Sequence, residues 1–202
     1  MRAMSFFADM GGNDLYEIRW HGRGGQGAIT SAQCLAQAAY LAGFRGVTSA
    51  PSFGAERRGA PVTASTRLSH EPIRMFSQVE YPDVVVVLDE TLLECADTSA
   101  GLKEGGWIVV NSPREPDALA LKAPFAVATA DATAIAREVG LIVAGTEMVN
   151  TAMLGVLARA TGLVELEHIR ATLAANFPVN VAEKNFEAAR LAYEGTKQRT
   201  RR

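Results

Sequence analysis

The segment YEIRWHGRGGQGAITSAQCLAQAAYLAGF, residues 16–44, decides the fold class of this chain. Residues 16–21 have the alternating pattern of a short strand, and residues 28–42 have the alanine- and leucine-rich composition of a helix. The turn between them, residues 22–27, is rich in glycine. A strand that leads through a glycine turn directly into a helix predicts an α/β protein.

The rest of the sequence alternates between strand and helix signals. The run VVVVLD at residues 84–89 is apolar and β-branched, which is typical of a parallel strand buried on both faces. Further strands are expected at residues 45–50, 62–69, 107–110 and 125–128. Helices are expected at residues 91–99, at 132–140 with Asp131 as N-cap, and at 148–160, 164–176 and 181–198. We therefore expect a doubly wound, mainly parallel sheet flanked by helices, with further helices at the C-terminal end.

One antiparallel pairing is expected within this sheet. Residues 62–69 alternate in polarity, and Glu71-Pro72 stands where a turn would lead into residues 73–76. The pattern predicts a hairpin formed by these two segments.

Composition indicates one globular domain without a nucleic-acid or membrane partner. The 202 residues are 48% hydrophobic and 21% charged, and the formal net charge is −2. We expect a flexible leader over residues 1–14, the domain over 15–198, and a solvated basic tail over 199–202. The run of basic residues that ends in this tail begins at Lys197. No apolar run approaches the length of a membrane span, so a cytoplasmic protein with reduced thiols is expected.

The glycine turn has two interpretations. Gly22, Gly24 and Gly27 match the spacing Gly-x-Gly-x-x-Gly, and together with Gly25 they leave backbone N–H groups free to approach an anion. A dinucleotide fold would place an acid about 20 residues downstream, where this chain has Phe44-Arg45-Gly46, so NAD is disfavoured. A phosphate cradle and a tight turn without a ligand both remain open.

The loop SFGAERRG, residues 52–59, presents Glu56, Arg57 and Arg58 between small residues. Guanidinium groups bind phosphates and carboxylates through paired hydrogen bonds, so this loop is a candidate contact for an anionic ligand or a partner subunit. A solvated charged loop is the alternative interpretation.

The segment MVNTAMLG, residues 148–155, opens a helix with Asn150 and places Gly155 one turn later. We interpret it as a core helix in which Gly155 permits close packing, with a ligand-facing Asn150 as the alternative. The acids Asp83 and Asp89, together with Glu90, bracket the strand at 84–88 and are interpreted as capping residues.

The sequence contains no pattern that indicates a metal site, an iron–sulfur cluster or a catalytic nucleophile. The three histidines, His21, His70 and His168, are scattered, and Cys34 and Cys95 are too few for an iron–sulfur cluster. Neither a Gly-x-Ser-x-Gly elbow nor a phosphate-loop Gly-Lys-Ser/Thr motif is present. On its own residues the chain is not a complete enzyme.

Three of these segments together resemble a known family. GRGGQGA at 22–28, SFGAERRG at 52–59 and NTAMLG at 150–155 occur in the order found in the gamma subunits of pyruvate and related 2-oxoacid:ferredoxin oxidoreductases. The likeness extends from about Glu17 to the last helix. The chain is identified as a member of this family on the joint occurrence of the three motifs.

The resemblance implies a non-catalytic subunit on the coenzyme A side of a larger complex. Alpha, beta and delta subunits would be its partners, with thiamine diphosphate, Mg²⁺ and 4Fe–4S clusters held outside this chain, coenzyme A as cosubstrate, and ferredoxin or a similar protein as electron acceptor. The complex would convert a 2-oxoacid to an acyl-coenzyme A. This chain would bind no cofactor of its own. Its contact residues toward coenzyme A or a partner would be Arg23, Gln26, Glu56, Arg57, Arg58 and Asn150.

Two alternatives accompany this hypothesis. The short subunit of indolepyruvate or arylglyoxylate oxidoreductases resembles the same domain, so the 2-oxoacid stays open, as do the electron acceptor and the subunit stoichiometry. A free-standing nucleotide-binding module that uses the glycine turn alone is the rival from another class. One departure from the family pattern is Ala60-Pro61 after Gly59, where relatives often continue with glycine, and proline stiffens the exit of the loop.

Overall fold

A seven-stranded sheet forms the centre of the computed structural model, which describes residues 15–51, 59–75, 77–119, 121 and 125–200. The strand order is β2 (Gly46–Pro51), β3 (Pro61–Ser69), β1 (Leu15–Arg23), β4 (Val84–Val87), β5 (Trp107–Asn111), β6 (Ala126–Ala130) and β9 (Lys197–Arg199). Strands β1, β4, β5 and β6 are parallel to one another, and antiparallel strands flank them on both sides. The expected α/β class with a mainly parallel central sheet is confirmed.

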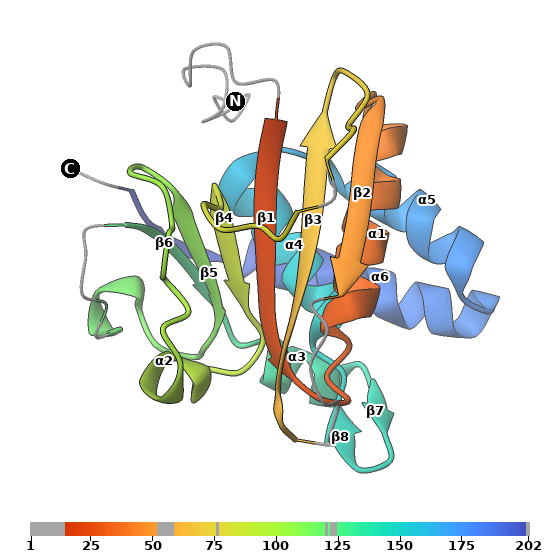
Figure 1. Cartoon of the computed structure of the whole chain (residues 1–202). Coiled ribbons are helices and arrows are strands. Elements are labelled where there is room, and N and C mark those ends of the chain that lie inside the picture. The colour runs from red at the N-terminus through yellow and green to blue at the C-terminus, as the bar shows by residue number, and fades with distance from the viewer. Residues whose placement is uncertain (1–14, 52–58, 76, 120, 122–124, 201–202) are drawn as a thin grey trace.

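Most helices cover one face of this sheet, as Figure 1 shows. They are α1 (Ala28–Leu41), α3 (Ala132–Glu138), α4 (Asn150–Thr161), α5 (Leu166–Asn176) and α6 (Val179–Glu194). Helix α1 packs on β1, β2 and β3, α4 packs on β5 and β6, and α6 packs against α4 and α5. The short α2 (Leu92–Cys95) and the 3₁₀ turn η2 (Pro116–Ala118) lie in the connections of the opposite face, and β7 (Ile142–Val143) and β8 (Thr146–Glu147) form a separate hairpin.

Strand β4 is the centre of the core because both of its faces are buried. Val84 and Val86 face the large cluster that includes Trp20, whereas Val85 and Val87 face a smaller cluster that includes Leu92. All four valines are fully buried. This two-sided burial explains why the sequence of β4 is continuously apolar instead of alternating.

The hairpin expected for residues 62–69 and 73–76 is wrong. Strand β3 pairs antiparallel with β1 on one side, where Val62 lies opposite Gly22, and with β2 on the other, where Leu68 lies opposite Val47. Because both edges of β3 are occupied, a third strand has no position beside it. Residues 73–75 belong to no strand, and residue 76 lies outside the described residues.

The C-terminal end also differs from the expectation. Helix α6 ends at Glu194, four residues before the expected end, and Lys197–Arg199 form the edge strand β9 against β6. Lys197 pairs with Glu115 at 2.7 Å, and Arg199 pairs with Asp117 at 2.9 Å. The helix expected up to residue 198 is therefore wrong over its last residues, whereas Lys197 and Gln198 remain exposed to solvent. Residues 201–202 lie outside the described part.

The remaining helix boundaries agree with the sequence patterns, apart from α2, which spans four residues instead of the nine expected at 91–99. Asp131 caps α3 as expected, because its carboxylate accepts the N–H of Ala134 at 2.8 Å. Within the described residues, no helix is both long enough and apolar enough to cross a bilayer. The leader expected at 1–14 falls outside the described residues.

Gly155 lies at the closest approach of α4 and α6. A Cβ at this position would lie 1.9 Å from the carbonyl oxygen of Ala189, a distance that requires the two helices to separate. The expected close packing is present, and it explains why glycine occurs inside a buried helix despite its low helix propensity.

Gly155→Ala is expected to destabilise the isolated chain by about 1–3 kcal/mol, because the added methyl overpacks the α4–α6 contact. Urea denaturation followed by circular dichroism measures this change. Ala174→Ser, a comparably small change on the exposed side of α5, is the control and should stay within about 0.5 kcal/mol. Equal stability of the two variants would contradict the packing argument.

Candidate functional site

The glycine turn places the beginning of α1 at the carboxyl end of β1. Gly25 has φ of +96° and Gly27 has φ of +80°, both in the region that residues with a Cβ rarely adopt. The first helical hydrogen bond runs from Ser31 N–H to Gly27 O at 2.9 Å, and the N-cap Gly27 has no capping side chain. The N–H groups of residues 28–30 precede this bond, so they are the donors that a helix start leaves available.

Gly27 is also the point where the first and third sequence motifs meet. A Cβ on Gly27 would lie 2.8 Å from Nδ2 of Asn150, and Ser31 Oγ donates to the carbonyl oxygen of Asn150 at 3.1 Å. Asn150 is 4% exposed, so its side chain is buried against the turn. The packing interpretation of residues 148–155 fits this arrangement, and the glycine at 27 keeps α1 and α4 in contact.

Glycine is required at different positions of the turn for different physical reasons. A Cβ added to Gly25 would meet no heavy atom within 4 Å, so the positive φ of this residue is the constraint there. At Gly22 a Cβ would lie 3.2 Å from Leu88 Cδ1, which is a tight contact. At position 25 the obstacle to a side chain is therefore backbone strain and not a clash of its Cβ.

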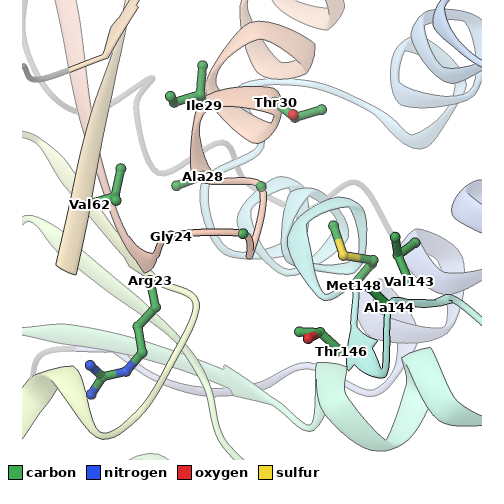
Figure 2. A pocket seen from close by; sticks show the side chains of 12 residues that line it. Arg23, Gly24, Ala28, Ile29, Thr30, Val62, Val143, Ala144, Thr146 and Met148 are labelled. Atoms are coloured by element: carbon green, nitrogen blue, oxygen red, sulfur yellow. The ribbon is translucent and has the colours of Figure 1, made fainter. Parts of the chain in front are cut away.

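A pocket of about 690 Å³ opens beside the start of α1. Figure 2 shows the turn and α1 on one side and residues of the β7–β8 hairpin and the segment after it on the other. The pocket is lined by Arg23, Gly24, Gly25, Gly27, Ala28, Ile29, Thr30, Val62, Val143, Ala144, Thr146 and Met148. Apolar side chains thus face a helix N-terminus, and this combination suits a ligand with both an anionic and an apolar part.

Arg23 and Gln26 are engaged with Asp89, which follows β4. Arg23 Nε donates to Asp89 Oδ2 at 3.0 Å, and Gln26 Nε2 donates to the same oxygen at 3.2 Å. Gln26 Oε1 in turn accepts the backbone N–H of Arg23 at 2.7 Å. In Figure 2 the guanidinium of Arg23 points away from Met148 and Val143 on the opposite wall. These two candidate contact residues therefore hold the turn in shape.

Asp89 is an ionised carboxylate stabilised by its neighbours. Partial burial raises the pKa of Asp89, but hydrogen bonds from Thr91 and Gln26 and the positive charge of Arg23 outweigh burial, so that the pKa is lowered. The capping role expected for Asp89 is wrong, because Thr91 is the N-cap of α2 and no side chain caps this helix. Asp89 Oδ1 instead accepts the N–H of Thr91 at 3.0 Å in the turn before α2.

The exit of the arginine loop joins the glycine turn. Gly24 N–H donates to Ala60 O at 2.8 Å, Gly59 N–H donates to Gly24 O at 3.2 Å, and Arg23 Nη1 donates to Gly59 O at 3.3 Å. The candidates Glu56, Arg57 and Arg58 lie outside the described residues. Two of the three sequence motifs therefore meet at this point through residues 59–60.

The three histidines and Cys34 occupy structural positions. His21 accepts a hydrogen bond from Arg19 Nε at 3.1 Å, and burial together with the Arg19 charge lowers its pKa to about 4. His70 stacks on Phe44, and Nδ1 of His168 accepts the N–H of Glu165 in a capping box. Burial raises the pKa of the Cys34 thiol to about 11, which makes it a poor nucleophile.

No group of three or more His, Cys, Asp or Glu side chains suited to a metal ion occurs in the part of the chain that the structure describes. Asp83 is buried at the opposite end of β4 from Asp89. Its carboxylate accepts the N–H of Glu17 at 2.8 Å and pairs with Lys103 Nζ at 2.9 Å. Asp83 therefore anchors β4 to β1 and is not the N-cap of a described helix, so the capping role expected for it is wrong.

Sequence reasoning missed the second wall of the pocket. Val143, Ala144 and Thr146 come from the short β7–β8 hairpin, where Ala144 has φ of +49° next to Gly145. The dipeptide Ala-Gly is a weak signal for a two-residue turn, which usually carries Asn-Gly or Asp-Gly. The pairing of Asp89 with the glycine turn was also missed. Asp89 is 66 positions from Arg23 and 63 positions from Gln26, and no local pattern connects residues so far apart.

The fold and the pocket define an α/β protein with a mainly parallel central sheet and a pocket at the helix start after its first strand. Residues 17–195 match the family model described as pyruvate ferredoxin/flavodoxin oxidoreductase. The chain belongs to this family. It is a gamma-type subunit of such an oxidoreductase, because the relatives that it matches over nearly their whole length are subunits of this kind.

Three relatives illustrate the similarity. The chain is 48% identical to the gamma subunit common to the pyruvate and ketoisovalerate oxidoreductases of Pyrococcus furiosus, over 90% of this chain and 97% of that protein. It is 47% identical to the pyruvate synthase subunit PorC of Methanothermobacter thermautotrophicus, over 89% of this chain and 95% of the relative. The crystal structure of the pyruvate oxidoreductase subunit PORC from Thermotoga maritima superimposes with a TM-score of 0.77 at 40% identity, covering 92% of this chain and 99% of that one.

Asp89→Asn is expected to lower the stability of the isolated chain at pH 7 by about 1–2 kcal/mol, because it removes the charge that holds Arg23. The lowered pKa means that ionised Asp89 stabilises the native state above its unfolded pKa of about 4, and that this contribution disappears as the pH falls through the lower native pKa. Unfolding free energies of both proteins measured from pH 7 to pH 3 should therefore converge. A constant difference over this range would contradict the electrostatic explanation.

Gly27→Ala is expected to cost more stability than Gly25→Ala, because position 27 adds a contact with Asn150 to the strain of positive φ, which is about 1–3 kcal/mol. In an Asn150→Ala background the cost of Gly27→Ala should fall, whereas that of Gly25→Ala should not change. Chemical denaturation of the single and double variants measures this coupling. Additive effects for Gly27 and Asn150 would show that their contact is unimportant.

Proposed function

We propose that this chain is the coenzyme-A-side subunit of a thiamine-diphosphate-dependent 2-oxoacid:ferredoxin oxidoreductase and carries no redox cofactor itself. The observation that supports the proposal best is the pocket at the start of α1, where uncapped backbone N–H groups face apolar side chains. Alpha, beta and delta subunits would hold thiamine diphosphate with Mg²⁺ and the 4Fe–4S clusters in the cytoplasm. The complex would transfer an acyl group from the 2-oxoacid to coenzyme A.

Coenzyme A suits the chemistry of this pocket. It is polyanionic and also has an uncharged pantetheine arm and an adenine ring. A phosphate would bind the N–H groups of residues 28–30, where the helix dipole favours negative charge. Ile29, Val143 and Met148 would contact an uncharged part of the ligand. The volume of about 690 Å³ lies within the range typical of pockets for small ligands and cofactors.

The remaining sequence candidates take different parts in this proposal. Gln26 and Asn150 would maintain the shape of the turn, since both are already engaged within the chain. Arg57 and Arg58, with Glu56 orienting one guanidinium, would add charged contacts to coenzyme A or to a partner. Support for this role is that the following residues, Gly59 and Ala60, are bonded to the turn.

The choice of 2-oxoacid would reside in other subunits. The Pyrococcus furiosus relative is named as a subunit common to pyruvate and ketoisovalerate oxidoreductases, so its name describes one gamma subunit serving two 2-oxoacids. An analogous division of labour here would leave this chain in contact with the cosubstrate that all such reactions share. The two cysteines of the sequence are too few to hold a 4Fe–4S cluster, which supports placing the clusters elsewhere.

Thr30→Glu is expected to raise the KM for coenzyme A about ten-fold or more in the assembled complex, because it places a negative charge where a phosphate would bind. Glutamate at the third helical position favours a helix start, so α1 should remain folded. The measurement is a coenzyme A titration at saturating 2-oxoacid, with complex composition confirmed by mass.

Thr30→Gln is the matched control, since it adds the same length without the charge. It should change the KM for coenzyme A far less than Thr30→Glu, and neither variant should change the KM for the 2-oxoacid. An unchanged coenzyme A requirement in Thr30→Glu would refute this pocket as the coenzyme A site.

A further inference from the structure

The carboxylate of Asp89 receives four hydrogen bonds from two segments. Its Oδ1 accepts the N–H of Thr91 at 3.0 Å and the hydroxyl of Thr91 at 2.6 Å. Its Oδ2 accepts Arg23 Nε at 3.0 Å and Gln26 Nε2 at 3.2 Å. Since 19% of the side chain is exposed, water competes little for these donors.

The bonds on Oδ2 continue into the backbone of the glycine turn. Gln26 Oε1 accepts the N–H of Arg23 at 2.7 Å, which closes a ring from Asp89 through Gln26 to the turn. Arg23 Nη2 also donates to Thr91 Oγ1 at 2.7 Å, which holds the guanidinium beside the end of β4. Glycines provide no side chain to restrict a turn, so its conformation depends on contacts of this kind.

Asp89 does not line the pocket that these bonds support. Arg23, Gly24, Gly25 and Gly27 line it, whereas Asp89 lies behind the turn and borders a neighbouring cavity of about 420 Å³. Asp89 is instead linked to the lining of the pocket through Arg23 and Gln26, which bind its carboxylate.

We propose that Asp89 is a positioning residue for coenzyme A binding, which acts by holding Gln26 and Arg23 so that the turn presents the N–H groups of α1 to the ligand. The inference rests on the proposed function of the pocket. A preorganised donor set binds an anion without a further entropic cost of ordering, so loosening the turn weakens ground-state binding of coenzyme A. The binding of the 2-oxoacid is not affected by the same loosening.

Asp83 provides a matched control for a purely structural role. It lies just before β4, is 1% exposed, and binds the N–H of Glu17 and the ammonium of Lys103. Asp83→Asn should lower the Tm of the complex at least as much as Asp89→Asn does. Because Asp83 has no connection to the pocket, its variant should leave the KM for coenzyme A at the wild-type value.

The experiment compares wild type, Asp89→Asn, Asp83→Asn and Thr30→Glu as assembled complexes. Asp89→Asn keeps an acceptor for Thr91 but lacks the charge for Arg23, and should raise the KM for coenzyme A about ten-fold with the KM for the 2-oxoacid unchanged. Gln26→Met, which breaks the same ring while Asp89 remains, should act in the same direction. It also serves as the second variant if Asp89→Asn does not assemble.

Each outcome decides the inference. If Asp89→Asn and Gln26→Met lower the Tm but leave the KM for coenzyme A at the Asp83→Asn value, the role of Asp89 is structural and the inference is wrong. If Thr30→Glu raises this KM while Asp89→Asn and Gln26→Met do not, the proposed function stands and the positioning role alone fails. If Thr30→Glu has no effect either, the pocket is not the coenzyme A site and both proposals fail.

Discussion

The contact between Gly27 and Asn150 is the constraint on which the rest of the structure depends. It joins the start of α1 to the start of α4, two segments separated by more than half of the chain, with no space for a Cβ between them. Helix α1 covers the β1, β2 and β3 side of the sheet, and α4 covers β5 and β6. Their common point of contact therefore sets how the two halves of the helical layer meet. The same contact locates the pocket, which opens beside Gly27.

Charged residues at the two ends of β4 fix the position of this strand beside β1, in addition to the packing of the helices. A strand of four buried valines has no polar side chain to determine its position along its neighbours. Asp83 before the strand binds the backbone of Glu17 at the start of β1, and Asp89 after it binds Arg23 at the end of β1. Both acids thus tie β4 to β1, and the second one does so at the residues that shape the pocket. Structural and functional constraints coincide at this end of the sheet.

The buried polar contacts of the helical layer illustrate how specificity is added to an apolar core. The indole N–H of Trp20 donates to Thr66 Oγ1 at 3.0 Å, and this hydroxyl donates to the carbonyl of Ala32 at 3.0 Å. Strands β1 and β3 are thereby connected to α1 through polar atoms that are fully satisfied. Mismatched packing would leave these atoms without partners, which is costly in a buried site.

The sequence by itself determined the α/β class, the central strand at 84–88, the capping by Asp131 and the family motifs, because each of these follows from local periodicity or from residues close together in the chain. It could not determine that β3 pairs with β1 and β2 or that Lys197–Arg199 form a strand. In both cases the partner edge is created by distant segments. The tertiary structure alone decided the second wall of the pocket and the bonds from Asp89 to the glycine turn. Pairing across more than 60 positions depends on how strands are ordered in the sheet, and no local pattern carries that information.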